Sequence, residues 1–535
     1  MNNPMAILQA LAMESRSNPA AALSRCEAML ARSPQLVPIL CLAGRLHREL
    51  GNLPRARERL EQALTLAPET PAALLELGMV ELASGRPSRA SSLFERHTTQ
   101  NPDRAEGWYQ LGVAREKTGA WPEAAEAYRA AIDRGISDPR DVQLRLAGVL
   151  ALAGHPAEAA EEYRQVLAET PDDVGAHVGL GMVAAALGDR PAAEKAYRAA
   201  LEADPTLALA RQQLVSIKTV ASPDDPDLAA LEDLARQDDL APESREHAHY
   251  GLAKAYLDLG RPADAFAAAA QANDDRENRV GLFDIPAWRR RVADIRVSES
   301  ADPASGLLPG GPAPVFLLTA PRSGATLLEQ MLTALPGLAS RGEDPLIERM
   351  LASLAPDWPH APPADSALDA IREAYAAGGL NTVNKLPGNI RIAGVLRRLY
   401  PGARFLRVTR DFRDTGLSMF LRDFPDAARF TTDLESIRAY LDGVEALTDR
   451  WTDLFPEAIH EVSYEALVKH PEATLRAVLE FLGQPWDPAC LDPAGNTAAV
   501  GTLSHADVRR PLHTGAVGRW RQFEDLLGPL TETTG

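Results

Sequence analysis

Apolar residues recur at helical spacing through the first half of the chain, in stretches that small residues and prolines separate. A Gly-x-x-x-x-Ala step returns every 34 or 35 residues, at Gly51/Ala56, Gly85/Ala90, Gly119/Ala124, Gly154/Ala159 and Gly188/Ala193. A second small residue precedes each step, at Gly44, Gly78, Gly112, Ala147 and Gly181. The pattern predicts pairs of antiparallel helices, in which small residues allow close approach, glycine turns the chain and proline ends the second helix.

One such helix pair cannot bury its apolar face, so neighbouring pairs must stack. The period resembles that of a tetratricopeptide (TPR) array, with about six units over residues 4–220 and a further copy over residues 242–275. The resemblance implies a helical solenoid over residues 1–275, whose groove would hold a protein or peptide. The alternative is an array that packs only against its own C-terminal half.

The pattern changes after residue 275. Residues 276–312 begin with a partly helical stretch and continue as ESADPASGLLPGGPAP, a composition that predicts a linker. From residue 313 to residue 535, short apolar runs alternate with amphipathic helices. This alternation is typical of an α/β domain.

The first apolar run of that domain leads into a loop suited to an anion. Residues 315–319 read as a buried parallel strand, residues 320–326 (APRSGAT) form a small-residue loop, and a helix follows. Loop amides and the helix dipole favour negative charge at such a place. The loop lacks the Gly-Lys-Ser/Thr end of an ordinary nucleotide-binding P-loop. A strand-to-helix turn without a ligand is the alternative.

A second strand, over residues 405–409, ends at Arg410, and Ser418 follows on a predicted helix. Ligands of open parallel sheets collect at the carboxyl ends of the strands, so Arg410 and Ser418 are suited to clamp a second phosphate. The alternative is a surface cluster in which neighbouring charges pair with one another, namely Arg407, Arg410, Asp411, Arg413 and Asp414.

Six motifs occur in order: PRSGATLLEQ, RGE, NKLPGN, RVTRDFRDTGLS, VSYEALVKHPE and VRRPLHTGAVGRW. With them, residues 313–535 resemble the sulfotransferases that use 3′-phosphoadenosine 5′-phosphosulfate (PAPS). The motifs are most similar to those of the bacterial TPR-containing branch and of tyrosylprotein sulfotransferases. The resemblance implies a P-loop-like α/β domain with a central parallel sheet, behind the helical TPR solenoid.

The resemblance also implies which residues bind PAPS. The 5′-phosphosulfate loop would consist of Arg322, Ser323, Gly324, Ala325 and Thr326, and the 3′-phosphate would contact Arg410 and Ser418. Family members often carry threonine at the place of Ala325, which keeps the backbone N–H and loses one hydroxyl donor. Tyr464 matches a family position near the nucleotide, although a packed core tyrosine is the alternative. Ser504 and Arg519 match positions that reach the phosphosulfate from a late loop.

Four residues would carry the chemistry. The resemblance makes Glu343 the general base for the acceptor hydroxyl, with Asp344 as a rival and a solvated loop acid as the alternative. Lys385 would stabilise the charge that develops on the leaving phosphate oxygen. It is one of only two lysines after residue 300 in a chain that prefers arginine. Arg322 and Ser504 complete the predicted catalytic set, while His505 and His513 read as loop histidines.

Composition narrows the class of protein. The chain has 535 residues and a net charge of −18, which argues against a general nucleic-acid binder. Three cysteines cannot build a disulfide framework, no apolar run approaches the length of a membrane span, and no His/Cys/Asp cluster has metal-ligand spacing. We therefore expect a cytoplasmic protein without a membrane span or metal. A homodimer stays open.

Together these features predict an enzyme that moves a sulfuryl group from PAPS to an acceptor hydroxyl or amine, with a protein tyrosine as one acceptor and PAP as the second product. Two other classes stay open. One is a TPR scaffold whose C-terminal domain binds PAP without turnover. The other is an ATP-dependent phosphotransferase, which the absent Gly-Lys-Ser/Thr opposes.

Overall fold

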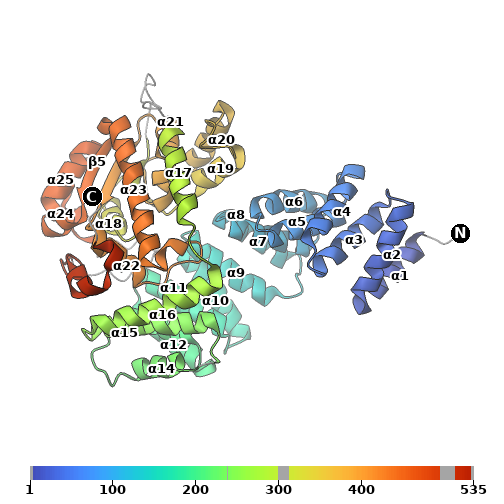
Figure 1. The fold of residues 1–535 in the computed structure, drawn as a ribbon, viewed down its shortest axis with the longest axis horizontal. Coiled ribbons are helices and arrows are strands. Elements are labelled where there is room, and N and C mark those ends of the chain that lie inside the picture. Colours follow the sequence, from blue (N-terminus) through green and yellow to red (C-terminus); the bar gives the residue numbers. More distant parts are fainter. Residues whose placement is uncertain (1–3, 238, 299–312, 494–511, 532–535) are drawn as a thin grey trace. The chain divides into compact units, whose positions relative to one another are not determined.

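The computed structural model describes residues 4–237, 239–298, 313–493 and 512–531, and the chain forms two compact units, Met1–Val166 and Leu167–Gly535. Figure 1 labels their helices and strands. The predicted site residue Ser504, with His505 beside it, lies outside the described residues.

The first unit is built of helix pairs that follow the sequence period. Its helices are α1 (Pro4–Ser17), α2 (Pro19–Arg32), α3 (Val37–Glu49), α4 (Leu53–Leu66), α5 (Pro71–Ala83), α6 (Pro87–Gln100), α7 (Ala105–Lys117), α8 (Trp121–Asp133), α9 (Pro139–Leu152) and α10 (Pro156–Glu169), whose end crosses the unit boundary. A Cβ on Gly112 would lie 2.5 Å from the Tyr128 ring, so the small residue lets α7 and α8 approach. The turn glycine Gly85 has a φ of +71°, which favours glycine. The predicted roles are therefore confirmed at these positions: the small residue allows close approach of two helices, and the glycine turns the chain.

The second unit begins with helices of the same kind. They are α11 (Val174–Leu187), α12 (Arg190–Ala203), α13 (Ala208–Ile217), α14 (Pro226–Ala235), α15 (Pro242–Asp258), α16 (Pro262–Val280) and α17 (Ile285–Ser298). The further copy expected over residues 242–275 is the pair α15 and α16. The helical-solenoid prediction is therefore confirmed in both units.

A five-stranded parallel sheet follows. Its strands are β1 (Val315–Leu318), β2 (Ala339–Gly342), β3 (Thr382–Asn384), β4 (Arg404–Thr409) and β5 (Ile459–Ser463), in the spatial order β2-β3-β1-β4-β5. Alternate residues of β1 belong to two different apolar clusters: Phe316 and Leu318 to one, Val315 and Leu317 to the other. Both faces of the sheet are therefore covered, as parallel sheets require. The predicted α/β fold with a central parallel sheet is confirmed.

The helices of this part cover those faces and carry the loops of the site. They are α18 (Ala325–Thr333), α19 (Leu346–Leu354), α20 (Asp365–Ala376), α21 (Ala393–Leu399), α22 (Phe412–Phe420), α23 (Leu434–Leu454), α24 (Tyr464–Lys469) and α25 (Pro471–Leu482). Short 3-10 turns complete it at η1 (Pro387–Arg391), η2 (Arg429–Thr431), η3 (Pro456–Ala458), η4 (Pro488–Leu491), η6 (Arg519–Leu526) and η7 (Gly528–Leu530).

Within the second unit, α16 and α17 pack directly on the α/β part, α17 beside α23 (Figure 1). The Asn273 side chain donates to the Phe420 carbonyl across 3.0 Å, and Phe266 stacks on Phe420 with ring centres 4.7 Å apart. The Trp288 indole donates to the Ala439 carbonyl across 3.1 Å. Residues 276–298 of the predicted linker thus form the end of α16 and helix α17, while residues 299–312 lie outside the described residues.

Candidate active site

Each strand of the sheet ends at a residue or loop that the sequence singled out. The loop of residues 319–324 follows β1, Glu343 follows β2, Lys385 follows β3, Arg410 follows β4 and Tyr464 follows β5. Because all five strands are parallel, these positions share one edge of the sheet, where ligands of such sheets bind.

The loop after β1 has strained backbone at two successive turns. Arg322 is the one non-glycine residue with a positive φ, +67°, among the described residues, and Gly324 has a φ of +102°. Such an outlier costs free energy and is typical of ligand-binding loops. Gly324 precedes α18, so the backbone N–H groups of the first helical turn, starting at Ala325, have no intrahelical acceptor. They form the kind of helix N-terminus that binds phosphate.

Three buried or half-buried side chains complete this loop. Ser323 is buried and donates its hydroxyl to the Ala320 carbonyl across 2.6 Å, and Thr326 is also buried. A Cβ on Gly324 would lie 2.4 Å from Cδ2 of Tyr464. Tyr464 is buried and packs directly against the loop, and its predicted position near the nucleotide stays a prediction.

Arg410 joins the loop after β1 to the C-terminal segment. Its guanidinium donates to the Arg322 carbonyl and to the Ala516 carbonyl, each across 2.8 Å, and lies 4.7 Å from the centre of the Tyr464 ring. Its Nε atom is buried and has no hydrogen-bond partner among the described residues. A buried, unsatisfied donor on a cation is a place for an anionic acceptor.

Ser418 lies on α22, as predicted, and accepts a hydrogen bond from Nε of Arg322 across 3.1 Å. Residues of the two predicted phosphate-binding segments, about 90 residues apart in the sequence, are therefore in direct contact. The predicted set Arg322, Arg410, Ser418 and Tyr464 forms one cluster.

The alternative interpretation, a cluster of mutually paired charges over residues 407–414, is met only in part. Asp411 pairs with Arg413 at 2.8 Å, while Arg407 turns to Asp449. Asp414 is buried and accepts from the backbone N–H groups of Gly518 and Trp520, across 2.6 and 2.8 Å. Arg519 lies between those two residues, so Asp414 fixes the backbone that carries it.

Lys385 and Glu343 form an ion pair at the other side of β1. Lys385 is buried, and its Nζ lies 3.0 Å from Oε1 of Glu343, whose side chain is 45% exposed. The rival Asp344 instead pairs with Arg341 at 3.2 Å and accepts from the N–H of Leu346 at the start of α19. Glu343 thus has the more accessible carboxylate beside the lysine.

A second carboxylate near Lys385 was missed by the sequence reasoning. Glu329 on α18 is buried, and its Oε2 lies 3.9 Å from Nζ of Lys385. Burial raises the pKa of the Glu329 carboxyl. The available signal was a charged residue inside the apolar run Leu327–Met331, on the helix face that must pack on the sheet.

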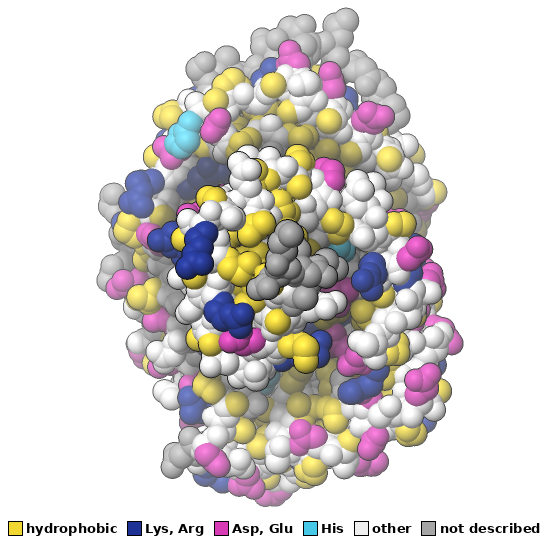
Figure 2. Space-filling model, turned by 90° about the vertical axis from the view of Figure 1, so that its right-hand side faces the viewer, with side chains coloured by type: hydrophobic (Ala, Val, Ile, Leu, Met, Phe, Trp, Pro, Cys, Tyr) yellow, Lys and Arg dark blue, Asp and Glu magenta, His cyan; other side chains and the backbone are white. Residues whose placement is uncertain are grey.

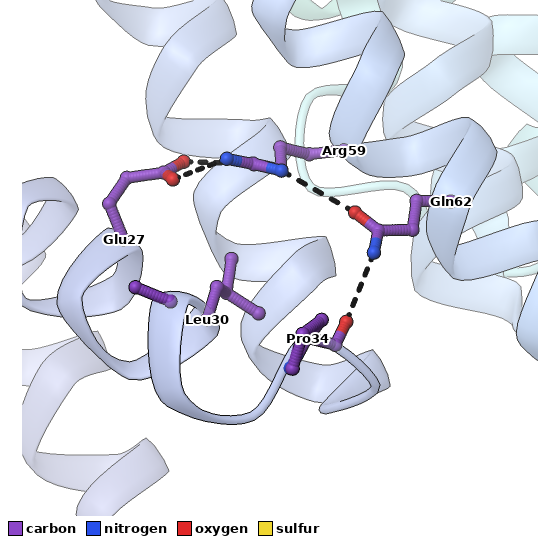
Figure 3. A pocket seen from close by; sticks show the side chains of 6 residues that line it. Glu27, Leu30, Pro34, Arg59 and Gln62 are labelled. Carbon is purple, nitrogen blue, oxygen red and sulfur yellow. Dashed lines mark hydrogen bonds and ion pairs between the residues drawn. The ribbon is translucent and has the colours of Figure 1, made fainter.

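The repeats offer a pocket of about 240 Å³ in the first unit, lined by Glu27, Leu30, Ala31, Pro34, Arg59 and Gln62 (Figure 3). Arg59 holds Glu27 at 2.5 Å, and this hydrogen bond lowers the pKa of the Glu27 carboxyl. Gln62 donates to the Pro34 carbonyl across 3.1 Å. The polar side chains of the pocket therefore form hydrogen bonds with one another and with the Pro34 carbonyl.

Three further observations concern the expectations about nucleic-acid binding, metal binding and membrane spans. Basic and acidic side chains are interspersed on the face shown in Figure 2, without a basic stripe. In the part of the chain that the structure describes, no three His, Cys, Asp or Glu side chains are placed to hold a metal. Within the same residues, every helix is too short or too polar to cross a bilayer.

Residues 314–488 match the model of the sulfotransferase family, and residues 41–97, 75–139 and 144–208 match a tetratricopeptide repeat model. An uncharacterised protein of Aquifex aeolicus is 26% identical over 408 residues, 70% of this chain and 52% of that protein. The protein-tyrosine sulfotransferase 2 of Gallus gallus is 28% identical over 235 residues, 38% of this chain and 62% of that protein. The chain thus spans about half to three fifths of the length of these curated relatives.

Among solved structures, the TPR protein YrrB is 19% identical with a TM-score of 0.33, over 35% of this chain and 95% of that one. The family-model matches confirm both resemblances that the sequence motifs indicated.

Proposed function

Since residues 314–488 form a sulfotransferase-family domain that follows tetratricopeptide repeats, we propose that the chain transfers a sulfuryl group from PAPS to an acceptor hydroxyl. A tyrosine of a protein or peptide is the acceptor that the similarity to protein-tyrosine sulfotransferases favours. The groove of the repeats would recruit that polypeptide. The proposed setting is cytoplasmic, in keeping with three buried, unbonded cysteines among the described residues.

The observation that carries the proposal is the contact between the two phosphate-binding arms. Arg322 donates to Ser418, and the Arg322 carbonyl accepts from Arg410. A nucleotide with phosphates at both the 5′ and 3′ positions would have one arm for each. The unsatisfied Nε of Arg410 and the N-terminus of α18 are donors that suit those phosphates.

In the proposed reaction, the residues at the sheet edge have separate roles in proton transfer and charge stabilisation. Glu343, half exposed, takes the proton of the acceptor hydroxyl as the acceptor oxygen bonds to sulfur. The bond between sulfur and the bridging phosphate oxygen breaks, and the oxygen leaves with its electron pair. Lys385 supplies a buried positive charge for that oxygen, where a low dielectric strengthens the interaction. PAPS itself supplies the activated sulfuryl group, so orientation and charge stabilisation are what the protein must add.

Calorimetric titration with PAP, 5′-AMP and ATP tests the binding step. We expect PAP to bind at least about tenfold more tightly than 5′-AMP, because a charge-assisted contact to the 3′-phosphate is worth about 1.5 kcal/mol or more. Arg410→Ala should abolish this preference. Arg404→Ala is the matched control, since Arg404 lies at the amino end of the same strand and binds the Glu457 carbonyl.

Transfer of labelled sulfate from PAPS to tyrosine peptides tests the reaction. Replacement of Lys385 by alanine should reduce transfer by two orders of magnitude or more, the scale of one lost electrostatic catalyst. Equal affinity for PAP and ATP would contradict the proposal and favour a phosphotransferase. PAP binding without transfer in any acceptor screen would favour a scaffold instead.

A further inference from the structure

Glu329 is a buried charge to which the proposed reaction gives no role. Glu329 is 2% exposed. Its neighbours on α18, namely Leu328, Met331 and Leu332, belong to the hydrophobic core. A carboxylate in such surroundings costs free energy unless hydrogen bonds or an opposite charge compensate for it. The compensating groups therefore indicate what the side chain does.

Those groups belong to the catalytic segments. Oε1 of Glu329 accepts from the Ser340 hydroxyl across 2.7 Å and from the Gly342 N–H across 3.1 Å. Gly342 immediately precedes Glu343, and its carbonyl accepts from the backbone N–H of Lys385 across 2.9 Å. The register between β2 and β3 shifts between Ser340 and Gly342, so the carboxylate lies at an irregularity of the sheet.

The second oxygen faces the lysine. Oε2 lies 3.9 Å from Nζ of Lys385, which also contacts Glu343 at 3.0 Å. The ammonium is thus between one exposed and one buried carboxylate. When Glu343 takes up the acceptor's proton it becomes neutral, and its attraction for the ammonium is lost. The charge of Glu329 remains beside Lys385 at that moment.

We propose that Glu329 is a positioning residue for sulfuryl transfer, which fixes the Gly342 backbone that presents Glu343 and holds the Lys385 ammonium in place while Glu343 is protonated. This inference rests on the proposed function. It deepens that function by assigning a further charged residue to the same site.

The principal variant is Glu329→Gln, which keeps the size and one acceptor oxygen and removes the charge. We expect kcat to fall at least about tenfold, because a misplaced catalytic group costs that much or more. The KM for PAPS and the affinity for PAP should stay within about twofold, since the Glu329 carboxylate contacts Ser340, Gly342 and Lys385 beside β2 and β3, whereas the residues proposed to bind the phosphates follow β1 and β4. Glu480→Gln, at an exposed position of α25, is the matched control and should behave as the wild type.

A second readout needs no turnover. Amine-reactive labelling followed by mass spectrometry measures the reactivity of Lys385 against exposed Lys469 in the same molecule. Loss of the buried counter-charge should raise the labelling rate of Lys385 several-fold in Glu329→Gln and leave Lys469 unchanged. Ser340→Ala, which removes one hydrogen bond to Glu329, should shift kcat and labelling in the same direction by less.

A double-mutant cycle with Lys385→Ala separates positioning from plain stability. If Glu329 acts through the lysine, Glu329→Gln should add little to the loss in the Lys385→Ala background. Additive losses, or wild-type kcat and labelling in Glu329→Gln, would overturn the inference. If Glu329→Gln does not fold, the same comparisons with Ser340→Ala decide. A wild-type chain that neither prefers PAP nor transfers sulfate would instead contradict the proposed function.

Discussion

Arg322 and Ser418 contact each other directly, with Nε of the guanidinium 3.1 Å from the serine hydroxyl oxygen. One follows β1 and the other lies on the helix after β4, and these two strands are neighbours in the sheet. The contact orients an arginine whose backbone is held at a φ of +67°. It therefore couples the loop proposed for the 5′-phosphosulfate to the helix proposed for the 3′-phosphate.

Ser418→Ala should weaken PAP binding about tenfold, because a hydrogen bond to a charged group contributes about 1.5–3 kcal/mol. Binding of 5′-AMP should change less, since it has no 3′-phosphate. Calorimetric titration of both nucleotides measures the difference. Ser418→Thr keeps the hydroxyl and is the matched control. An equal loss for PAP and 5′-AMP would show that Ser418 serves only the loop.

Gly324→Ala should both destabilise the second unit and reduce PAP affinity. The added Cβ would lie 2.4 Å from the Tyr464 ring at a φ of +102°. Gly337→Ala is a close control, since Gly337 has a φ of +98° and nothing within 4 Å of the added Cβ. It should cost only the left-handed backbone penalty of about 1–2 kcal/mol.

Calorimetric melting with and without PAP measures both glycine variants. The drop in Tm should be larger for Gly324→Ala, and only that variant should lose the stabilisation that PAP gives. Equal drops in Tm with PAP stabilisation retained in both would refute the close packing of Tyr464 on the loop.

The motifs predicted most of this edge of the sheet because each lies within one strand and the loop after it. The buried run before Arg322 and the run before Arg410 carry their own strand signal, so the positions of both residues follow from local sequence. The contacts of Glu329 and Asp414 could not be predicted from local sequence, because their partners lie in other segments of the chain. Asp414 read as part of a charged surface cluster, yet its partners are backbone groups about 100 residues later.

The repeats show the same division between local and distant information. The 34-residue period predicts a small residue at Gly112, because the side chain that packs against it, Tyr128, belongs to the same repeat. Residues 276–298 read as the partly helical start of a linker. Their burial depends on side chains of the α/β part, such as the contact of Trp288 with α23, which no repeat pattern contains.

Asp414→Ala should release the C-terminal segment from α22. The buried N–H of Trp520 and the half-buried N–H of Gly518 would lose their acceptor, which we expect to cost about 2 kcal/mol or more, since an orphaned buried donor costs about 1–3 kcal/mol. The stacking of Arg413 on Trp520, 3.6 Å from the ring centre, and the hydrogen bond from Arg410 to the Ala516 carbonyl would remain. Limited proteolysis and calorimetry measure the change, with Asp453→Ala at an exposed position of α23 as the control. An unchanged cleavage rate near residues 512–520 would contradict this role.

Glu329→Gln should stabilise the second unit relative to the wild type as the pH rises. Burial raises the pKa of the Glu329 carboxyl above the usual value of 4.5, so the folded chain still binds a proton that the unfolded chain has released. Wild-type stability therefore falls as the pH increases from about 4.5 through the folded pKa, whereas glutamine is neutral throughout. The advantage of the variant should grow by about 1.4 kcal/mol for each unit of difference between the two pKa values. Calorimetry between pH 4 and pH 8 measures this difference in unfolding free energy, on the unfolding transition that PAP shifts. The exposed control Glu480→Gln should show the same pH dependence of stability as the wild type. If the stability advantage of the variant shrinks as the pH rises, the raised pKa of Glu329 is contradicted. If the advantage grows and kcat falls, the charge of Glu329 serves function and lowers stability.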